Sequence, residues 1–141
     1  MNYIGIDPST HTGLVILDEQ GNVIHQEEIG SELVLDPQRF MDISEQIIRL
    51  FFKFCYDEKI KVMVEGFSFG SRGKGVSTQY GIGWTIRVAL INKKIDYIEV
   101  TPNALKKFAT GKGNSKKEDM ILPIYKRWGY QNDSDNIRDA Y

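Results

Sequence analysis

Short apolar runs separated by turn residues make up the start of the chain. Runs over 2–7 and 12–17 predict two strands, joined by the turn residues Pro8-Ser9-Thr10-His11. Gly21-Asn22 marks a tight turn into a third run over 23–28. The pattern predicts an antiparallel meander of three strands.

The next segment changes to a helical pattern. Asp36 and Pro37 have the residue types of a helix N-cap and of a first helical position. After them, large apolar residues recur at helical spacing, which predicts a helix with one core face. These residues are Phe40, Ile43, Ile47, Leu50, Phe51 and Phe54. The short apolar run over 61–64 then predicts a buried central strand.

Helix and strand patterns alternate through the second half of the chain. A glycine-bearing loop is predicted over 67–77, and a final helix is capped by Asp133 or Ser134. This helix is expected to be incomplete, because the sequence stops at Tyr141, soon after the cap. Between them, the pattern predicts helices over 78–92, 102–108 and 115–128 and a strand over 95–100.

Three antiparallel strands followed by strand–helix units are typical of an α/β fold with a mixed sheet. We therefore expect a five-stranded mixed sheet with helices on both faces. A length of 141 residues fits a single domain over 1–141. In this order, the strands that end at Asp7 and Glu65 are expected to lie side by side in the centre of the sheet.

Composition excludes several classes of protein. No apolar stretch approaches the roughly 20 residues that span a bilayer, and the N-terminus lacks the pattern of a signal peptide. The lone Cys55 excludes an internal disulfide, fits a reducing cytoplasm and is expected to pack as a small apolar group. A composition rich in lysine, isoleucine and tyrosine fits an AT-rich bacterial or phage genome. We expect a cytoplasmic protein without a membrane partner.

The net charge of −1 hides an uneven distribution along the chain. Residues 65–117 carry 10 basic and 3 acidic side chains, whereas residues 1–64 carry 5 basic and 11 acidic ones. A basic middle between acidic flanks suggests one face built for a polyanion such as nucleic acid. A solvated, lysine-rich surface is the alternative interpretation.

Four carboxylates suggest a metal site. Asp7 and Glu65 each end an apolar run, where an unpaired acid is costly to bury. Asp135 and Asp139 are four residues apart and share a face of the last predicted helix. If the four converge, they form an all-oxygen pocket for two Mg²⁺ or Mn²⁺ ions, which supports phosphodiester hydrolysis. Structural salt bridges at strand ends are the alternative.

The chain resembles the RuvC family of Holliday junction resolvases, within the RNase H-like nuclease superfamily. Its first motif, Gly5-Ile6-Asp7-Pro8-Ser9-Thr10 with Thr12-Gly13, is similar to the family's first motif, and Val64-Glu65 is similar to its second acid. The resemblance covers nearly the whole chain. Its remaining matches are Thr101-Pro102, Leu105-Lys106, Gly111-Lys112-Gly113, Lys117 and Asp139-Ala140.

The resemblance implies an RNase H-like fold and a homodimeric, magnesium-dependent endonuclease that nicks two opposed strands of a four-way DNA junction. It implies that Asp7, Glu65 and Asp139 are metal ligands. The family usually places an acid or histidine where this chain has Asn136. We take Asp135 as the fourth ligand and keep Asn136 as the alternative.

The resemblance also implies DNA contacts. Lys106 and Lys117 are expected to bind phosphates near the scissile bond. Phe67 or Phe69 is expected to stack on unpaired bases, with packing under the loop as the alternative. The helix that carries Tyr80, Gly81, Gly83, Trp84 and Arg87 is the expected dimer interface. Further backbone contacts are expected from Lys107, Lys112, Lys116, Arg72 and Lys74.

Three other functions remain open at this point. The first motif also resembles the phosphate loop of actin-like and sugar-kinase ATPases, but those proteins need a second lobe and a second glycine-rich loop. An RNA-processing nuclease of the same superfamily is a second alternative. A noncatalytic module that binds branched DNA is the third, because Asn136 replaces an acid.

Overall fold

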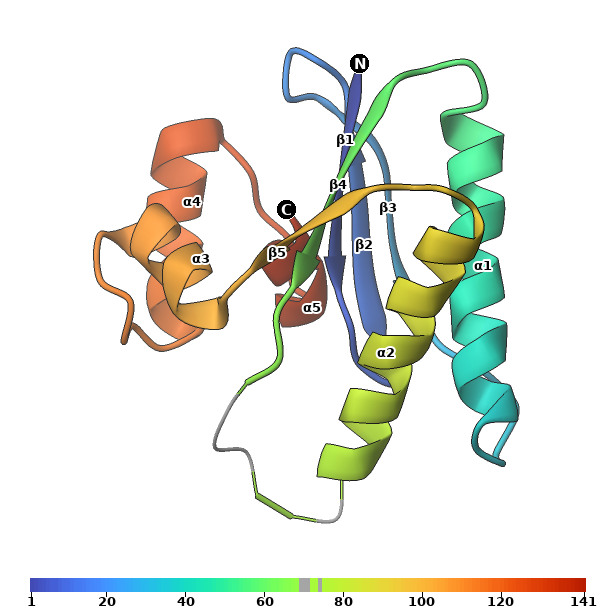
Figure 1. The fold of residues 1–141 in the computed structure, drawn as a ribbon. Helices are drawn as coiled ribbons and strands as arrows, with labels where there is room; N and C mark the ends of the chain where they lie inside the picture. The colour runs from blue at the N-terminus through green and yellow to red at the C-terminus, as the bar shows by residue number, and fades with distance from the viewer. Residues whose placement is uncertain (69–71, 74) are drawn as a thin grey trace.

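The computed structural model describes residues 1–68, 72–73 and 75–141. Its five strands form one mixed sheet in the order β3-β2-β1-β4-β5, with helices on both faces (Figure 1). The expected fold class is therefore confirmed. Figure 1 also shows β1 and β4 running in the same direction through the centre of the sheet.

The first three strands form the predicted antiparallel meander. β1 (Asn2–Asp7) pairs with β2 (Thr12–Leu17), and β2 pairs with β3 (Val23–Ile29). The turn between β2 and β3 is closed by the Asp18 carboxylate, which accepts backbone hydrogen bonds from two turn residues at 2.8 and 2.9 Å. Gly21 lies in this turn with φ +83°, a conformation that glycine adopts without strain.

The other two strands add to the meander in parallel. β4 (Ile60–Glu65) pairs with β1, with Ile6 opposite Val64, and β5 (Tyr97–Val100) pairs with β4. This register brings Asp7 and Glu65 to the same edge of the sheet, as the sequence predicts. In β4, buried Val62 and Val64 alternate with exposed Lys61 and Met63, so this part of the strand packs against the core on one face only.

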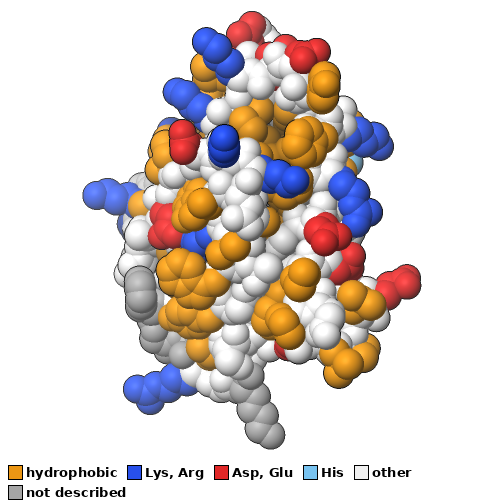
Figure 2. Space-filling view, turned by 45° about the vertical axis from the view of Figure 1, so that its right-hand side comes forward, with side chains coloured by type: hydrophobic (Ala, Val, Ile, Leu, Met, Phe, Trp, Pro, Cys, Tyr) orange, Lys and Arg blue, Asp and Glu red, His pale blue; other side chains and the backbone are white. Residues whose placement is uncertain are grey.

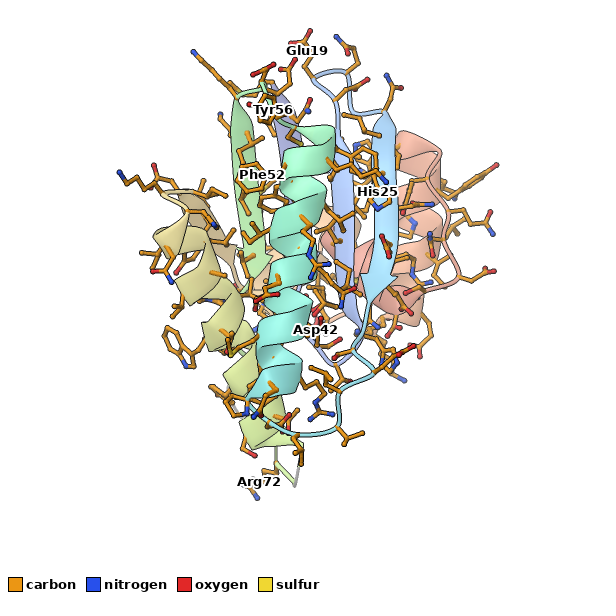
Figure 3. All side chains as sticks on the ribbon, turned by 90° about the vertical axis from the view of Figure 1, so that its right-hand side faces the viewer. Glu19, His25, Asp42, Phe52, Tyr56 and Arg72 are labelled. Atoms are coloured by element: carbon orange, nitrogen blue, oxygen red, sulfur yellow. The ribbon has the colours of Figure 1, made fainter. Side chains whose placement is uncertain are left out.

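Two long helices cover one face of the sheet. α1 (Gln38–Phe54) and α2 (Val76–Asn92) pack against each other and over the strands; Figure 3 views the molecule from the α1 side. Their apolar faces enclose the main core with Ile4, Ile6, Leu14 and Ile16 of the sheet. Cys55 packs in this core as an apolar group, as expected.

The short helix α5 (Asp135–Ala140) lies on the opposite face, where Ile137 and Ala140 pack against Val15 of β2. α3 (Pro102–Thr110) and α4 (Glu118–Trp128) pair beside the sheet, beyond β5 (Figure 1). Thr101 caps α3 by accepting the Ala104 N–H at 3.2 Å, and Pro102 is its first residue, as predicted.

Three predicted helix starts are wrong. α2 begins at Val76, two residues before the predicted start. α1 begins at Gln38, because the Asp36 carboxylate pairs with the guanidinium of Arg39 at 2.9 and 3.0 Å instead of capping the helix. α4 begins at Glu118 rather than Ser115, because the Ser115 hydroxyl lies 2.7 Å from the Thr110 hydroxyl and closes the preceding turn. At α5, Ser134 is the cap; its hydroxyl accepts the Ile137 N–H at 3.2 Å.

Candidate metal centre

Three carboxylates from distant parts of the chain meet at one end of the sheet. Asp7 is the last residue of β1, Glu65 is the last residue of β4, and Asp139 lies on α5. One carboxylate oxygen of each lies within 4.8 Å of the others. The sequence predicts this convergence from strand order and from the position of the last helix.

Two glycines let α5 lie this close to the sheet. A Cβ at Gly5 of β1 would lie 1.7 Å from the carbonyl oxygen of Ala140, and a Cβ at Gly13 of β2 would lie 2.0 Å from that of Asn136. Both distances are far below van der Waals contact, so any side chain here would push α5 outward. The two glycines therefore set the distance between Asp139 and Asp7.

The acid cluster is electrostatically strained. Burial raises the pKa of Asp7 to about 6, and the negative charge of Asp139 adds to this shift. Burial raises the pKa of Glu65 to about 9, and the charges of Asp7 and Asp139 add to it. Three acids held this close favour either a bound proton or a bound cation.

Lys117 supplies a cation to the cluster. It immediately precedes α4, and its Nζ lies 2.8 Å from Oδ2 of Asp139 and 3.0 Å from Oδ2 of Asp135. Although burial acts in the opposite direction, hydrogen bonds to Asp139 and Asp135 raise the pKa of Lys117 above its usual value. The hydrogen bond from Lys117 likewise lowers the pKa of Asp135.

The donor set fits a hard divalent cation. All three groups offer oxygen, which is the ligand atom that Mg²⁺ and Mn²⁺ prefer. Oε2 of Glu65 is buried and has no hydrogen-bond partner among the described residues. A buried carboxylate oxygen without a partner is costly, and a metal ion would satisfy it. The residues that would hold such an ion are Asp7, Glu65 and Asp139.

The two candidates for a fourth ligand lie at the margin of this group. The Asp135 side chain is 49% exposed, against 8% for Asp139, and faces Lys117. The Asn136 side chain donates to Oε1 of Glu28 at 3.1 Å, and the Ser134 hydroxyl binds the same oxygen. Glu28 of β3 thus anchors the first turn of α5, a role that sequence reasoning missed because the two segments are distant in the chain.

The predicted DNA-binding lysines differ in their surroundings. Lys106 is half-buried on α3, whereas Lys107, Lys112 and Lys116 are exposed. Arg72 is exposed at the tip of the molecule beyond the start of α2 (Figure 3). Phe69 and Lys74 lie outside the described residues.

Phe67 packs on α2. Its ring stacks on Tyr80 at a centroid distance of 4.7 Å and an interplanar angle of 9°, and the Arg87 guanidinium lies 4.4 Å from its centroid. These residues line a cavity of about 40 Å³ that also includes Asp7 and Glu65. Stacking of Phe67 on a DNA base stays a prediction, and any such stacking has to start from this packed position.

The small residues of α2 face inward. A Cβ at Gly81 would lie 2.3 Å from the Phe40 ring, and one at Gly83 would lie 2.5 Å from the Phe67 ring. These glycines therefore admit aromatic rings of the same chain. The outer face of α2 is apolar instead, with exposed Trp84, Val88 and Ile91. Figure 2 shows hydrophobic side chains gathered on this side of the molecule.

Solved structures share this fold. Thermus thermophilus RuvC matches with a TM-score of 0.79 and 21% identity over 99% of this chain and 89% of that chain. The chain has the RuvC fold. The T. thermophilus RuvC complex with Holliday junction substrate matches with a TM-score of 0.76 and 21% identity, covering 99% of this chain and 88% of that chain.

A more distant match lies in yeast. The yeast mitochondrial Holliday junction resolvase Ydc2 matches with a TM-score of 0.52 and 14% identity, over 98% of this chain and 75% of that chain. No protein-family model and no curated protein matches this sequence. The likeness that these comparisons find is therefore one of structure, at 14–21% sequence identity. Among the described residues, no helix combines the length and apolar character needed to cross a bilayer.

Proposed function

We propose that this protein is a Holliday junction resolvase, a structure-selective endonuclease that nicks two opposed strands of four-way DNA. The observation that carries the proposal is the convergence of Asp7, Glu65 and Asp139 within 4.8 Å at one end of a RuvC-type sheet. A structural neighbour with 21% identity, T. thermophilus RuvC, has been solved with a Holliday junction substrate. The fold therefore accommodates this substrate in at least one protein.

We infer that the acid cluster holds two Mg²⁺ ions, for which Mn²⁺ can substitute, with Asp135 as a further ligand and Asn136 as the alternative. When bound, such ions supply Lewis acidity, which acidifies water and neutralises charge on the phosphate. The chain itself contributes the fixed carboxylates of Asp7 and Glu65 at two rigid strand ends. Rigid strand ends keep these carboxylates in a fixed arrangement, which supports the proposal because catalysis depends on positioned groups.

Lysine side chains bring the DNA phosphates to this cluster. Lys117 already lies at the acids, and Lys106 is on the adjacent helix α3. We infer that both contact phosphates near the scissile bond, where a cation offsets negative charge in the transition state. The exposed Lys107, Lys112 and Lys116 then add salt-dependent affinity for the DNA backbone.

A four-way junction offers two equivalent strands, so a symmetric dimer suits it. We infer that two copies associate through the outer face of α2. Trp84, Val88 and Ile91 are 57%, 53% and 62% exposed on one chain, and their burial between two copies would remove apolar surface from water. Such a pair would carry two acid clusters, one for each opposed strand.

Nicking of a synthetic, immobile four-way junction tests the function directly. The purified protein should nick the junction symmetrically with Mg²⁺ or Mn²⁺ and leave linear duplex, forks and RNA hairpins largely intact. D7N should abolish nicking and keep the affinity for the junction, because a neutral amide weakens metal binding without adding negative charge. Binding without nicking at any Mg²⁺ or Mn²⁺ concentration would favour a noncatalytic binding module. Preferred cleavage of RNA would favour an RNA-processing nuclease.

A further inference from the structure

Arg87 is an almost completely buried charge beside the metal centre. It lies in α2 between apolar residues, and only 1% of its surface is exposed. Burial of an ion costs several kcal/mol unless the ion is well paired. A leucine or methionine would be enough to dock α2 on the sheet, so the guanidinium calls for an explanation beyond packing.

The guanidinium binds three different elements at once. Its Nε donates to Oε1 of Glu99 on β5 at 2.5 Å, and its Nη1 donates to the carbonyl oxygen of Gly83 on α2 at 2.9 Å. Its Nη2 donates to the carbonyl oxygen of Glu65 at 3.2 Å. The planar fork of arginine can reach three acceptors in different directions, which a lysine ammonium on a single stem does less well.

The Arg87 guanidinium also contacts Phe67, the second residue after the end of β4. The guanidinium carbon lies 4.4 Å from the centroid of the Phe67 ring. This ring also packs against the rings of Tyr80 and Trp84. Arg87 therefore contacts the backbone of Glu65 and the side chain two residues later. It also lines the 40 Å³ cavity that Glu65 and Asp7 share.

We propose that Arg87 is a positioning residue for Glu65. By holding the Glu65 carbonyl and the Phe67 ring, it fixes the direction in which the Glu65 carboxylate leaves the end of β4. Glu65 then presents a carboxylate oxygen to Asp7 and Asp139 before any cation binds. This inference rests on the proposed metal site, and it adds a residue that does not itself touch the metal or the DNA.

R87K tests the proposal, because it keeps the positive charge and removes the fork. The dissociation constant for Mn²⁺, measured by calorimetry on the full chain without DNA, should rise about tenfold, as is typical when a residue that orients a metal ligand is lost. The matched control is R39K, because Arg39 makes a two-point contact with Asp36 far from the acid cluster. R39K should bind Mn²⁺ as the wild type does. Wild-type Mn²⁺ affinity in a folded R87K protein would overturn the proposal.

The nicking kinetics of R87K separate a positioning role of Arg87 from general damage to the fold. In R87K, the maximal nicking rate at saturating Mn²⁺ should fall, while the junction concentration for half-maximal rate and junction affinity without metal stay within twofold of wild type. Equal loss of junction affinity and rate would indicate a merely structural role. If the wild type does not nick at all, the proposed function fails, whereas the Mn²⁺ comparison still decides the role of Arg87.

A second variant tests the proposal if the R87K protein does not fold. E99Q removes the only carboxylate that Arg87 contacts among the described residues, and Glu99 is half-exposed, so the substitution is mild. The amide oxygen of glutamine can still accept a hydrogen bond, but without the ion pair the guanidinium is held less firmly against Glu65. E99Q should weaken Mn²⁺ binding at least threefold, and unchanged Mn²⁺ affinity in E99Q would count against the proposal.

Discussion

The ammonium nitrogen of Lys117 lies 2.8 Å from Oδ2 of Asp139, so a lysine of this chain balances the acid cluster. The charge of Lys117 lowers the pKa of both Asp7 and Glu65, against the larger upward effect of burial. A divalent cation held by the same acids would compete with Lys117 for Asp139. Metal binding is therefore expected to release Lys117 toward a DNA phosphate.

Replacement of Lys117 by alanine should separate these two roles. K117A should bind Mn²⁺ several-fold more tightly, because it removes the competing cation, and should nick the junction at least tenfold more slowly. With Ca²⁺ present, the slope of log affinity against log salt should decrease by about one. The control is K59A, since Lys59 lies beside the start of β4, away from Glu65. A K117A protein with wild-type nicking rate and salt slope would contradict this role.

The strand pattern predicts the central geometry of the site. Asp7 and Glu65 each end a predicted apolar strand, and the parallel pairing of these two strands brings their carboxyl ends to one edge of the sheet. The serine at 134 has the residue type of a helix cap, so the start of α5 follows from local chemistry. These features depend on neighbouring residues or on strand order, and both can be predicted from the sequence.

Other contacts depend on segments that meet only in the folded chain. The residues next to Lys116 and Lys117 give no reason to assign one of them to the acid cluster. Lys117 reaches Asp139 because of where the folded chain places the turn before α4. The contact of Arg87 with the Glu65 carbonyl and that of Asn136 with Glu28 are of the same kind. An arginine within an apolar helix face is the one local signal that could have marked Arg87 as a buried, paired charge.

Stability of the metal-free protein should fall as pH rises. The folded-state pKa values of Asp7 and Glu65 are raised to about 6 and about 9, so the folded protein holds these protons more tightly than the unfolded chain does. Their stabilising effect is complete below their ordinary pKa values near 4 and is lost as pH rises through about 6 and then about 9. Thermal melts between pH 5 and pH 9 should show a decrease of several degrees.

E65Q provides the matched comparison for this pH dependence. Its melting temperature should exceed that of the wild type at pH 8 and change less with pH, because an amide needs no proton to be neutral. Addition of Mn²⁺ should raise the melting temperature of the wild type more than that of E65Q. A wild-type melting temperature that rises from pH 6 to pH 9 without metal would refute the assignment.

Gly5 should tolerate no side chain. In G5A, the new Cβ would start 1.7 Å from the Ala140 carbonyl oxygen, so α5 has to shift and carry Asp139 away from Asp7. We expect a loss of about 1–3 kcal/mol in the free energy of unfolding and at least tenfold weaker Mn²⁺ binding. G75A is the control, because a Cβ at Gly75 meets nothing within 4 Å. Unaltered Mn²⁺ affinity in G5A would show that the position of α5 is unimportant.

The outer face of α2 should control the oligomeric state. V88E places a charge in the centre of the exposed apolar surface formed with Trp84 and Ile91, and should convert the proposed dimer to a monomer in sedimentation experiments. Symmetric nicking of both strands should be lost with it. The control is V34E, since Val34 is 84% exposed outside any helix or strand. A wild-type protein that sediments as a monomer at all concentrations would exclude this interface.

Crystals grown with Mn²⁺ test the central claim most directly, because manganese can be located by its anomalous scattering. The account predicts a manganese peak bonded to carboxylate oxygens of Asp7, Glu65 and Asp139, with the Lys117 ammonium displaced from Asp139. Manganese bound elsewhere, or none between these three side chains while Lys117 keeps its contact, would contradict it.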